Sequence, residues 1–317
     1  MPSQTPEFGF EEIMVKRDYY SPTQLTWQRF NKHHLAKISL WMLLVLTCLV
    51  FIMPAIFKHT LGLHYYTVNL DERFSAPSLK HPAGTDELGR DVITRLFSGG
   101  RISITIAFLS AIISLLFGSI IGAMAGYYGG WVDTLLMRFT DGMIALPTLP
   151  LMILLAAIDL QKLFPDALAW MARGNFASLI KLMIIIVFFG WMTVARLVRG
   201  EFLSLREREF ILASRAMGNH HQKIIWFHML PNCMAPMIVA TTLSIGNIIL
   251  YEAVLSFLGL GIQPPIPSWG NMLHYALDYV RNAPLLAVLP GFFILITVIS
   301  INFVGDGLRD ALDPRHS

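Results

Sequence analysis

The run ISITIAFLSAIISLLFGSIIGAMA, residues 102–125, decides the fold class, because it contains no charged side chain. A helix rises about 1.5 Å per residue, so about 20 apolar residues cross the roughly 30 Å hydrocarbon core of a membrane. Lipid offers the backbone no hydrogen-bonding partners, whereas a helix satisfies its own. Residues 102–125 are therefore predicted to form a transmembrane helix.

Five more runs of similar length are mostly apolar, at residues 35–57, 134–158, 178–197, 232–258 and 284–304. The composition agrees, since 55% of the residues are hydrophobic and only 14% are charged, against about 25% charged in soluble domains. The sequence predicts an all-α polytopic membrane protein with six transmembrane helices. Pro147 and Pro150 lie within the third run and are expected to bend it.

The polar segments between these runs give the expected organisation. Residues 1–34 form an N-terminal segment that is too long and too polar for a cleavable signal peptide. A loop follows at 58–101, then a core of five spans at 102–304, and a tail at 305–317. The dense Lys and Arg cluster between the fourth and fifth runs predicts that this loop and both termini are cytoplasmic, with residues 58–101 on the periplasmic side.

Several residues in the spans are unusual for simple membrane anchors. Ser114, Gly118 and Gly122 form a stripe of small residues that allows another helix to approach closely, either in this chain or in a partner. Asn247 and Glu252 are candidates for the lining of a translocation pathway. Glu252 lies near the predicted outer end of its span, so solvation there is an equally good explanation.

Other function classes find no support in the sequence. No basic groove for nucleic acid, no metal-ligand spacing and no HExxH or GxSxG motif is present, so we expect no catalytic residue and no metal site. The segment GTDELGRD, residues 84–91, matches no EF-hand loop and is interpreted as structural. The chain contains no Gly-Lys pair and hence no phosphate-binding P-loop of the G-x-x-x-x-G-K-[ST] form.

The segment EFLSLREREFILASRAMGNHHQKIIWFHMLP, residues 201–231, is polar and lies between two spans. A helix is predicted over 205–217, with Phe210, Ala213 and Met217 on one face, and Gly218-Asn219 should end it. A second short helix is expected from about 222 to 230. An ordered insertion of this length is more often functional than a simple connection. We interpret it as a docking element.

Here the sequence resembles a known family. Leu212-Ala213-Ser214, Gly218 and Leu230-Pro231 resemble the "EAA" loop of permeases of ATP-binding-cassette importers. GTDELGRD, the run LSFLGLGIQPPIPSWGNML at 255–273 and GDGLRDALDPR at 305–315 are similar to segments of the dipeptide and oligopeptide permease "C" subunits. The resemblance covers residues 30–315. The family's Glu is replaced here by Leu212 and its second Ala by Ser214.

The resemblance implies a type I importer transmembrane domain with a cytoplasmic coupling helix, located in a bacterial inner membrane. Its expected partners are a second permease subunit in a heterodimer, two P-loop ATPase subunits and a substrate-binding protein. The residues expected to contact the ATPase are Phe210, Leu212, Ala213, Ser214, Met217, Gly218, Leu230 and Pro231. Di- or oligopeptides are the expected cargo, with nickel complexes, glutathione or another peptide-like solute as alternatives. An ion-driven secondary transporter is a distant alternative.

Overall fold

The computed structural model describes residues 21–158 and 176–313, and the regular elements within these ranges are all helical. Five helices are long and apolar enough to cross a membrane, or six if one bent pair is counted as a single span. The larger helices are α1 (Pro22–Lys32), α2 (His34–Thr60), α3 (Val92–Tyr128), α4 (Gly130–Ala145), α5 (Thr148–Ala157), α8 (Ala177–Arg206), α9 (Glu209–Ala216), α11 (Met234–Phe257), α12 (Trp269–Ala276) and α13 (Leu285–Leu312). The short elements are η1 (Leu70–Glu72), α10 (His221–Lys223), the π-helical turn η2 (Ile224–Met229), η3 (Leu230–Cys233) and η4 (Leu277–Tyr279).

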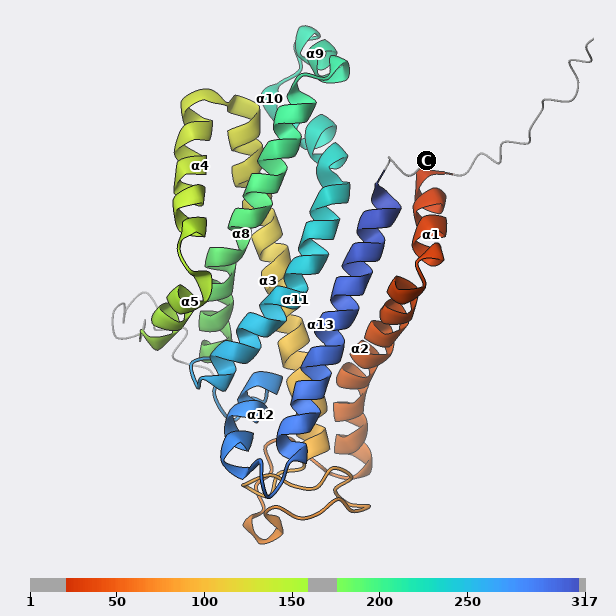
Figure 1. Cartoon of the computed structure of the whole chain (residues 1–317), viewed down its shortest axis with the longest axis vertical. Helices are drawn as coiled ribbons and strands as arrows, with labels where there is room; N and C mark the ends of the chain where they lie inside the picture. The colour runs from red at the N-terminus through yellow and green to blue at the C-terminus, as the bar shows by residue number, and fades with distance from the viewer. Residues whose placement is uncertain (1–20, 159–175, 314–317) are drawn as a thin grey trace, which may run out of the picture.

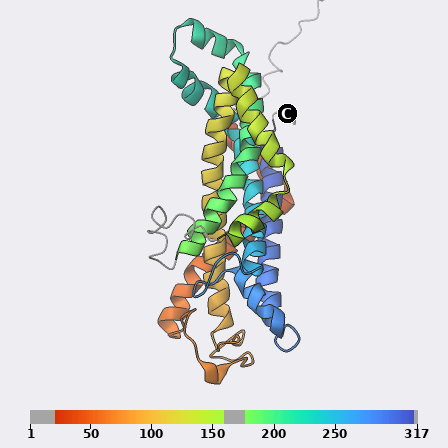
Figure 2. The ribbon, with the colours of Figure 1, turned by 90° about the vertical axis from the view of Figure 1, so that its left-hand side faces the viewer.

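The long helices α2, α3, α8, α11 and α13 run side by side along the long axis of the molecule (Figure 1). One end of this bundle carries α9 and α10, which extend beyond it (Figure 2). The opposite end carries α12 and the segment 61–91. We call these two ends the α9 end and the cap end.

Helices α3 and α8 approach each other most closely, and glycines on α3 make this possible. A Cβ atom added at Gly118 would lie 2.5 Å from the carbonyl oxygen of Trp191, and one at Gly122 would collide with the carbonyl of Ala195. One turn further, a Cβ atom at Gly126 would lie 2.5 Å from Cβ of Phe202. Of the two explanations for the small-residue stripe, packing within the chain is therefore correct for Gly118 and Gly122.

The third apolar run does not form one continuous helix. α4 and α5 are bent by 85° at a break after Ala145. Leu146 has an extended backbone, with φ −81° and ψ 143°, because the ring of Pro147 disfavours the helical conformation of the preceding residue. The bend was predicted from the prolines, but the predicted run 134–158 forms two helices instead of one continuous helix.

Two helices extend beyond the predicted apolar runs. α3 begins at Val92, well before the predicted start at 102, and α13 continues to Leu312 through most of the predicted tail. Charged residues such as Arg95 and Arg309 lie in these extensions, so hydropathy alone does not detect them. Residues 1–20 of the predicted N-terminal segment and residues 314–317 of the tail lie outside the described residues.

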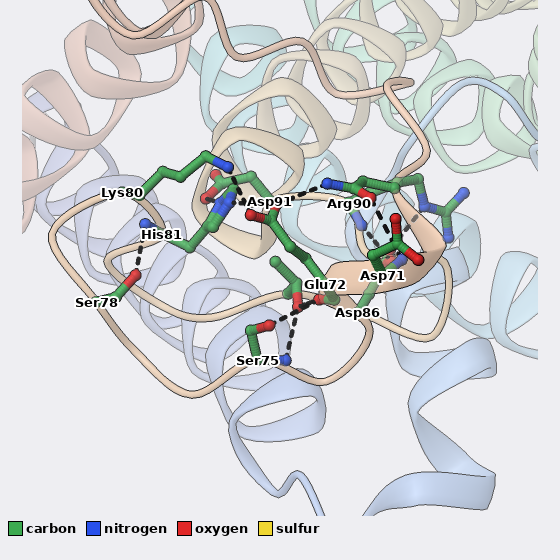
Figure 3. Close-up of polar contacts among 11 residues, drawn as sticks. Asp71, Glu72, Ser75, Ser78, Lys80, His81, Asp86, Arg90 and Asp91 are labelled. Carbon is green, nitrogen blue, oxygen red and sulfur yellow. Dashed lines mark hydrogen bonds and ion pairs between the residues drawn. The ribbon is translucent and has the colours of Figure 1, made fainter.

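An ion-pair network holds the segment 61–91 against the start of α3 (Figure 3). Oδ1 of Asp91 accepts a hydrogen bond from the Thr94 amide at 2.7 Å and so caps α3. Its Oδ2 lies 3.0 Å from Nδ1 of the buried His81. Asp86 pairs with Arg90 at 2.7 Å and with Arg95 at 3.3 Å. The segment 84–91 is thus a structural element that begins α3.

The surroundings of two glutamates at the cap end shift their pKa values in opposite directions. Burial raises the pKa of Glu87, and the nearby carboxylate of Asp86 adds to this effect. The hydrogen bond from Lys80 lowers the pKa of Glu72. No group of three or more His, Cys, Asp or Glu side chains arranged to hold a metal ion occurs among residues 21–158 and 176–313.

The α3–α8 contact predicts different effects on stability for two glycine-to-alanine substitutions. Gly122→Ala should lower the free energy of unfolding by about 2 kcal/mol, because the added methyl group collides with a backbone carbonyl that cannot easily move. Gly200→Ala on α8 is the matched control, since nothing lies within 4 Å of its Cβ position, and it should leave the stability unchanged or increase it. Thermal unfolding in detergent measures both. Equal melting temperatures for the two variants would contradict the assigned contact.

Candidate functional site

The projection at the α9 end owes its bent shape to Gly218. The Gly218 amide donates to the carbonyl of Arg215 at 2.9 Å, and the Asn219 amide donates to the carbonyl of Ser214 at 3.3 Å. These two bonds form a Schellman motif, which requires a left-handed residue after the helix. Gly218 has φ +77° and meets this requirement. The predicted stop at Gly218-Asn219 is confirmed.

The first predicted helix of the projection is divided in two. α8 ends at Arg206, and α9 begins at Glu209 after a break at Glu207 and Arg208. The second predicted helix, 222–230, corresponds to α10 and the π-helical turn η2, which lead through η3 into α11. The projection is therefore connected to α8 on one side and to α11 on the other.

One face of α9 is anchored in a small hydrophobic core. Ile211 is fully buried in a cluster with Phe202 of α8 and with Ile224 and Met229 of η2. Ser214 lies on the same side, 3% exposed, and its hydroxyl accepts a hydrogen bond from the Asn219 side chain at 3.1 Å. α9 is thus held rigidly on the ends of two long helices.

The other face of α9 is open. Phe210 is 46% exposed, Leu212 51% and Met217 75%. Large apolar side chains at such exposure, at the tip of a projection, are typical of an interaction surface.

The remaining predicted contact residues differ in their exposure. Ala213 is exposed like its three apolar neighbours, whereas Ser214 points into the protein. Leu230 is half-buried and packs against the same hydrophobic core, and Pro231 is exposed beside it. The predicted set therefore contains both surface residues and residues that support the surface.

The sequence analysis did not predict two features of the α9 end. Trp226 and Phe227 of η2 are 51% and 73% exposed and add aromatic area to the projection. An aromatic pair within an otherwise charged segment was the available signal. The second feature is a contact with α3. The Tyr127 hydroxyl lies 2.7 Å from Nδ1 of His221, and the guanidinium carbon of Arg215 lies 4.9 Å from the centre of the Tyr127 ring.

The two candidate pathway residues lie in different environments. Asn247 is exposed on α11. Glu252, one and a half turns further along the same helix, is completely buried. Its Oε2 accepts a hydrogen bond from the Ser103 hydroxyl of α3 at 2.7 Å, and its Oε1 accepts one from Ser256 at 2.8 Å. Of the two explanations for Glu252, solvation at the outer end of its span is therefore wrong.

Trp269 of α12 completes the network around Glu252. Its amide donates to the Ser103 hydroxyl at 3.3 Å, and its indole Nε1 donates to the carbonyl of Leu96 at 3.0 Å. Gly100 leaves the space that the Trp269 ring fills, since a Cβ atom there would lie 2.5 Å from the ring. Glu252 thus connects α3, α11 and α12 near the cap end.

Comparison with known proteins gives two family matches. Residues 118–317 match the family described as "Binding-protein-dependent transport system inner membrane component". Residues 21–77 match the "N-terminal TM domain of oligopeptide transport permease C". Together these matches include α1, α2 and every helix from α4 onward.

Similar curated proteins are transport permeases. The chain is 39% identical to the dipeptide transport system permease protein DppC of Alkalihalophilus pseudofirmus, over 99% of this chain and 97% of the relative. It is 36% identical to the oligopeptide transport system permease protein OppC of Bacillus subtilis, over 90% and 88%. It is 35% identical to the glutathione transport system permease protein GsiD of Pectobacterium atrosepticum, over 96% and 94%.

Among solved structures, a chain of the MetNI methionine ABC transporter in an inward-facing conformation shares the fold. The TM-score is 0.51 at 18% identity, and the similarity covers 69% of this chain and 96% of that chain. This similarity shows that the two chains share a fold. The chain belongs to the family of binding-protein-dependent transport system inner membrane components.

Proposed function

We propose that this chain forms half of the membrane pathway of an ATP-driven importer for peptides. The observation that carries this proposal is the group of exposed apolar side chains at the tip of a rigid projection, namely Phe210 and Leu212 on α9 and Met217 at its C-terminal cap. A short helix of this kind fits a groove on a partner protein and transmits a rigid-body displacement. The relatives named for dipeptide and oligopeptide transport support the choice of cargo.

Energy would come from other subunits. The sequence has no P-loop, so ATP and Mg²⁺ would be bound by two separate ATPase subunits, each receiving one coupling helix, and this chain would not itself be an enzyme. A second permease subunit would supply the other half of the pathway. A separate binding protein would deliver cargo at the cap end. In this arrangement the α9 end and both termini are cytoplasmic.

Glutathione is the second candidate cargo, because the chain is 35% identical to a glutathione permease over nearly its whole length. Glutathione is itself a small peptide, so the same pathway chemistry would serve. Nickel complexes have no comparable observation in their favour. An ion-driven secondary transporter would leave the exposed face of α9 without a role.

Within the pathway, we propose different roles for the two polar residues of α11. Asn247 is exposed and is the better candidate for contact with cargo. Glu252 is buried between α3, α11 and α12. Its proposed role is to hold together the helices that frame the pathway.

The direct test is purification of the full chain from its native membrane in mild detergent, with identification of every stoichiometric partner. A second permease of similar length and P-loop ATPases are expected. A chain that purifies alone and still transports solute would contradict the proposal.

Gly218→Val is predicted to uncouple transport from ATP hydrolysis. A β-branched residue at φ +77° is strained by about 1–2 kcal/mol, which should distort the end of α9 and misplace its exposed face. ATP-dependent uptake of a labelled dipeptide by the reconstituted complex should fall severalfold, with normal membrane insertion.

Two control variants test the specificity of that result. Gly130→Val introduces comparable strain, at φ +56°, in the turn between α3 and α4, and should retain more uptake. Leu212→Glu should be tolerated, because Leu212 is half exposed and the family has Glu there. Uptake equal to that of the parent in Gly218→Val would refute the coupling role of α9.

Glu252→Ala is predicted to destabilise the cap end, and Glu252→Gln much less. Alanine leaves the hydroxyls of Ser103 and Ser256 without their acceptor and creates a cavity, at a cost of about 3 kcal/mol. Glutamine keeps one oxygen acceptor in the same shape. Thermal unfolding is the measurement. A Glu252→Gln variant that melts normally but loses dipeptide uptake would show instead that the carboxylate acts in the pathway.

A further inference from the structure

A cavity of about 510 Å³ opens at the cap end, between the last turns of α2 and the first turns of α3. Lys58 and His59 line it from α2, and Arg101 lines it from α3. Its remaining walls come from the segment around Tyr65 and Tyr66 and from the turn at residues 265–267. None of the described residues that line the cavity is acidic.

Two residues that line this cavity carry hydroxyls without partners. Thr94 and Ser98 lie one turn apart on α3, and neither hydroxyl forms a hydrogen bond. Thr94 is 2% exposed and Ser98 7%. Buried hydroxyls normally have hydrogen-bond partners, so two unpaired ones on residues that line one cavity indicate a missing acceptor or donor.

The cations identify the missing group as an anion. Neither Lys58 nor Arg101 forms an ion pair with any residue in the described ranges 21–158 and 176–313. The guanidinium of Arg101 lies over the ring of Phe51, 5.9 Å from its centre, which keeps it beside the cavity. Two cations and two free hydroxyls match the acceptor oxygens of a phosphate or carboxylate.

The cavity also has a fixed wall. Arg95, which is held by Asp86, donates a hydrogen bond to the carbonyl of Tyr65 at 3.3 Å. The rings of Tyr65 and Tyr66 meet edge to face with their centres 5.2 Å apart. The cap network thus positions the aromatic side of the cavity.

The surroundings favour a lipid as the source of the anion. Lys58 and His59 occupy the last turn of the apolar helix α2, where a span reaches the membrane surface. Leu44 and Phe51 are 48% and 44% exposed on the face of α2 that continues through Ala55 into the cavity. An apolar stripe that ends in a cationic pocket is complementary to an anionic lipid, which has an apolar chain and a charged headgroup.

We infer that this cavity binds the phosphate of an anionic phospholipid from the membrane leaflet at the cap end. The headgroup phosphate contacts Arg101, Lys58 and the hydroxyls of Thr94 and Ser98, and an acyl chain lies along the exposed face of α2. Phosphatidylglycerol is the simplest lipid with this chemistry, because it has one net negative charge and no headgroup cation to repel Lys58 and Arg101.

The test is a native mass-spectrometric titration of the purified full chain with phosphatidylglycerol and with phosphatidylcholine. The parent should retain one phosphatidylglycerol in preference to phosphatidylcholine. Arg101→Gln should weaken that binding about tenfold, as expected for loss of a charge-assisted hydrogen bond. The double variant Thr94→Val with Ser98→Ala should weaken it by a smaller factor while keeping the helix shape.

Arg281→Gln is the matched control, since Arg281 is an exposed cation that does not line the cavity. It should bind phosphatidylglycerol like the parent. Equal affinity of the parent and Arg101→Gln would overturn the proposal. Displacement of the lipid by a dipeptide but not by its C-terminal amide would assign the cavity to a cargo carboxylate, and displacement by inorganic phosphate without any lipid preference would assign it to a free anion.

Discussion

Backbone-to-backbone packing of α3 against α8 is the contact on which the rest of the structure depends. Gly118, Gly122 and Gly126 leave no room for a side chain on this face of α3. In lipid, helices gain little from burying apolar surface, so their association depends on such close van der Waals contact. Because α8 leads into α9 and α3 begins at the cap, this one contact aligns both ends of the molecule.

α3 connects these two ends physically. It has 37 residues, so it is roughly 55 Å long at about 1.5 Å per residue. At the α9 end its Tyr127 contacts His221 and Arg215 of the projection. At the cap end its Ser103 bonds to the buried Glu252. A displacement of α9 would therefore reach the helices around Glu252 through a single rigid element.

The sequence predicts some of these features and not others, for physical reasons. Apolar runs locate the spans, and Gly218 reveals the end of α9, because both signals are local. The early start of α3 depends on Asp91, Asp86 and Arg95, whose pairing is set by the tertiary structure. Asp141 likewise accepts a hydrogen bond of 2.6 Å from Arg196 of α8, a partner that is distant in the sequence and that no local pattern indicates. Burial of Glu252 follows from α12 folding back onto α3, which no local pattern encodes.

The most direct test of the account is uptake of a labelled dipeptide into proteoliposomes that contain this chain and the subunits that copurify with it. The account predicts uptake that requires ATP hydrolysis, persists without any ion gradient and stops when the ATPase subunits are omitted. Uptake by the chain alone, driven by an ion gradient and indifferent to ATP, would contradict it.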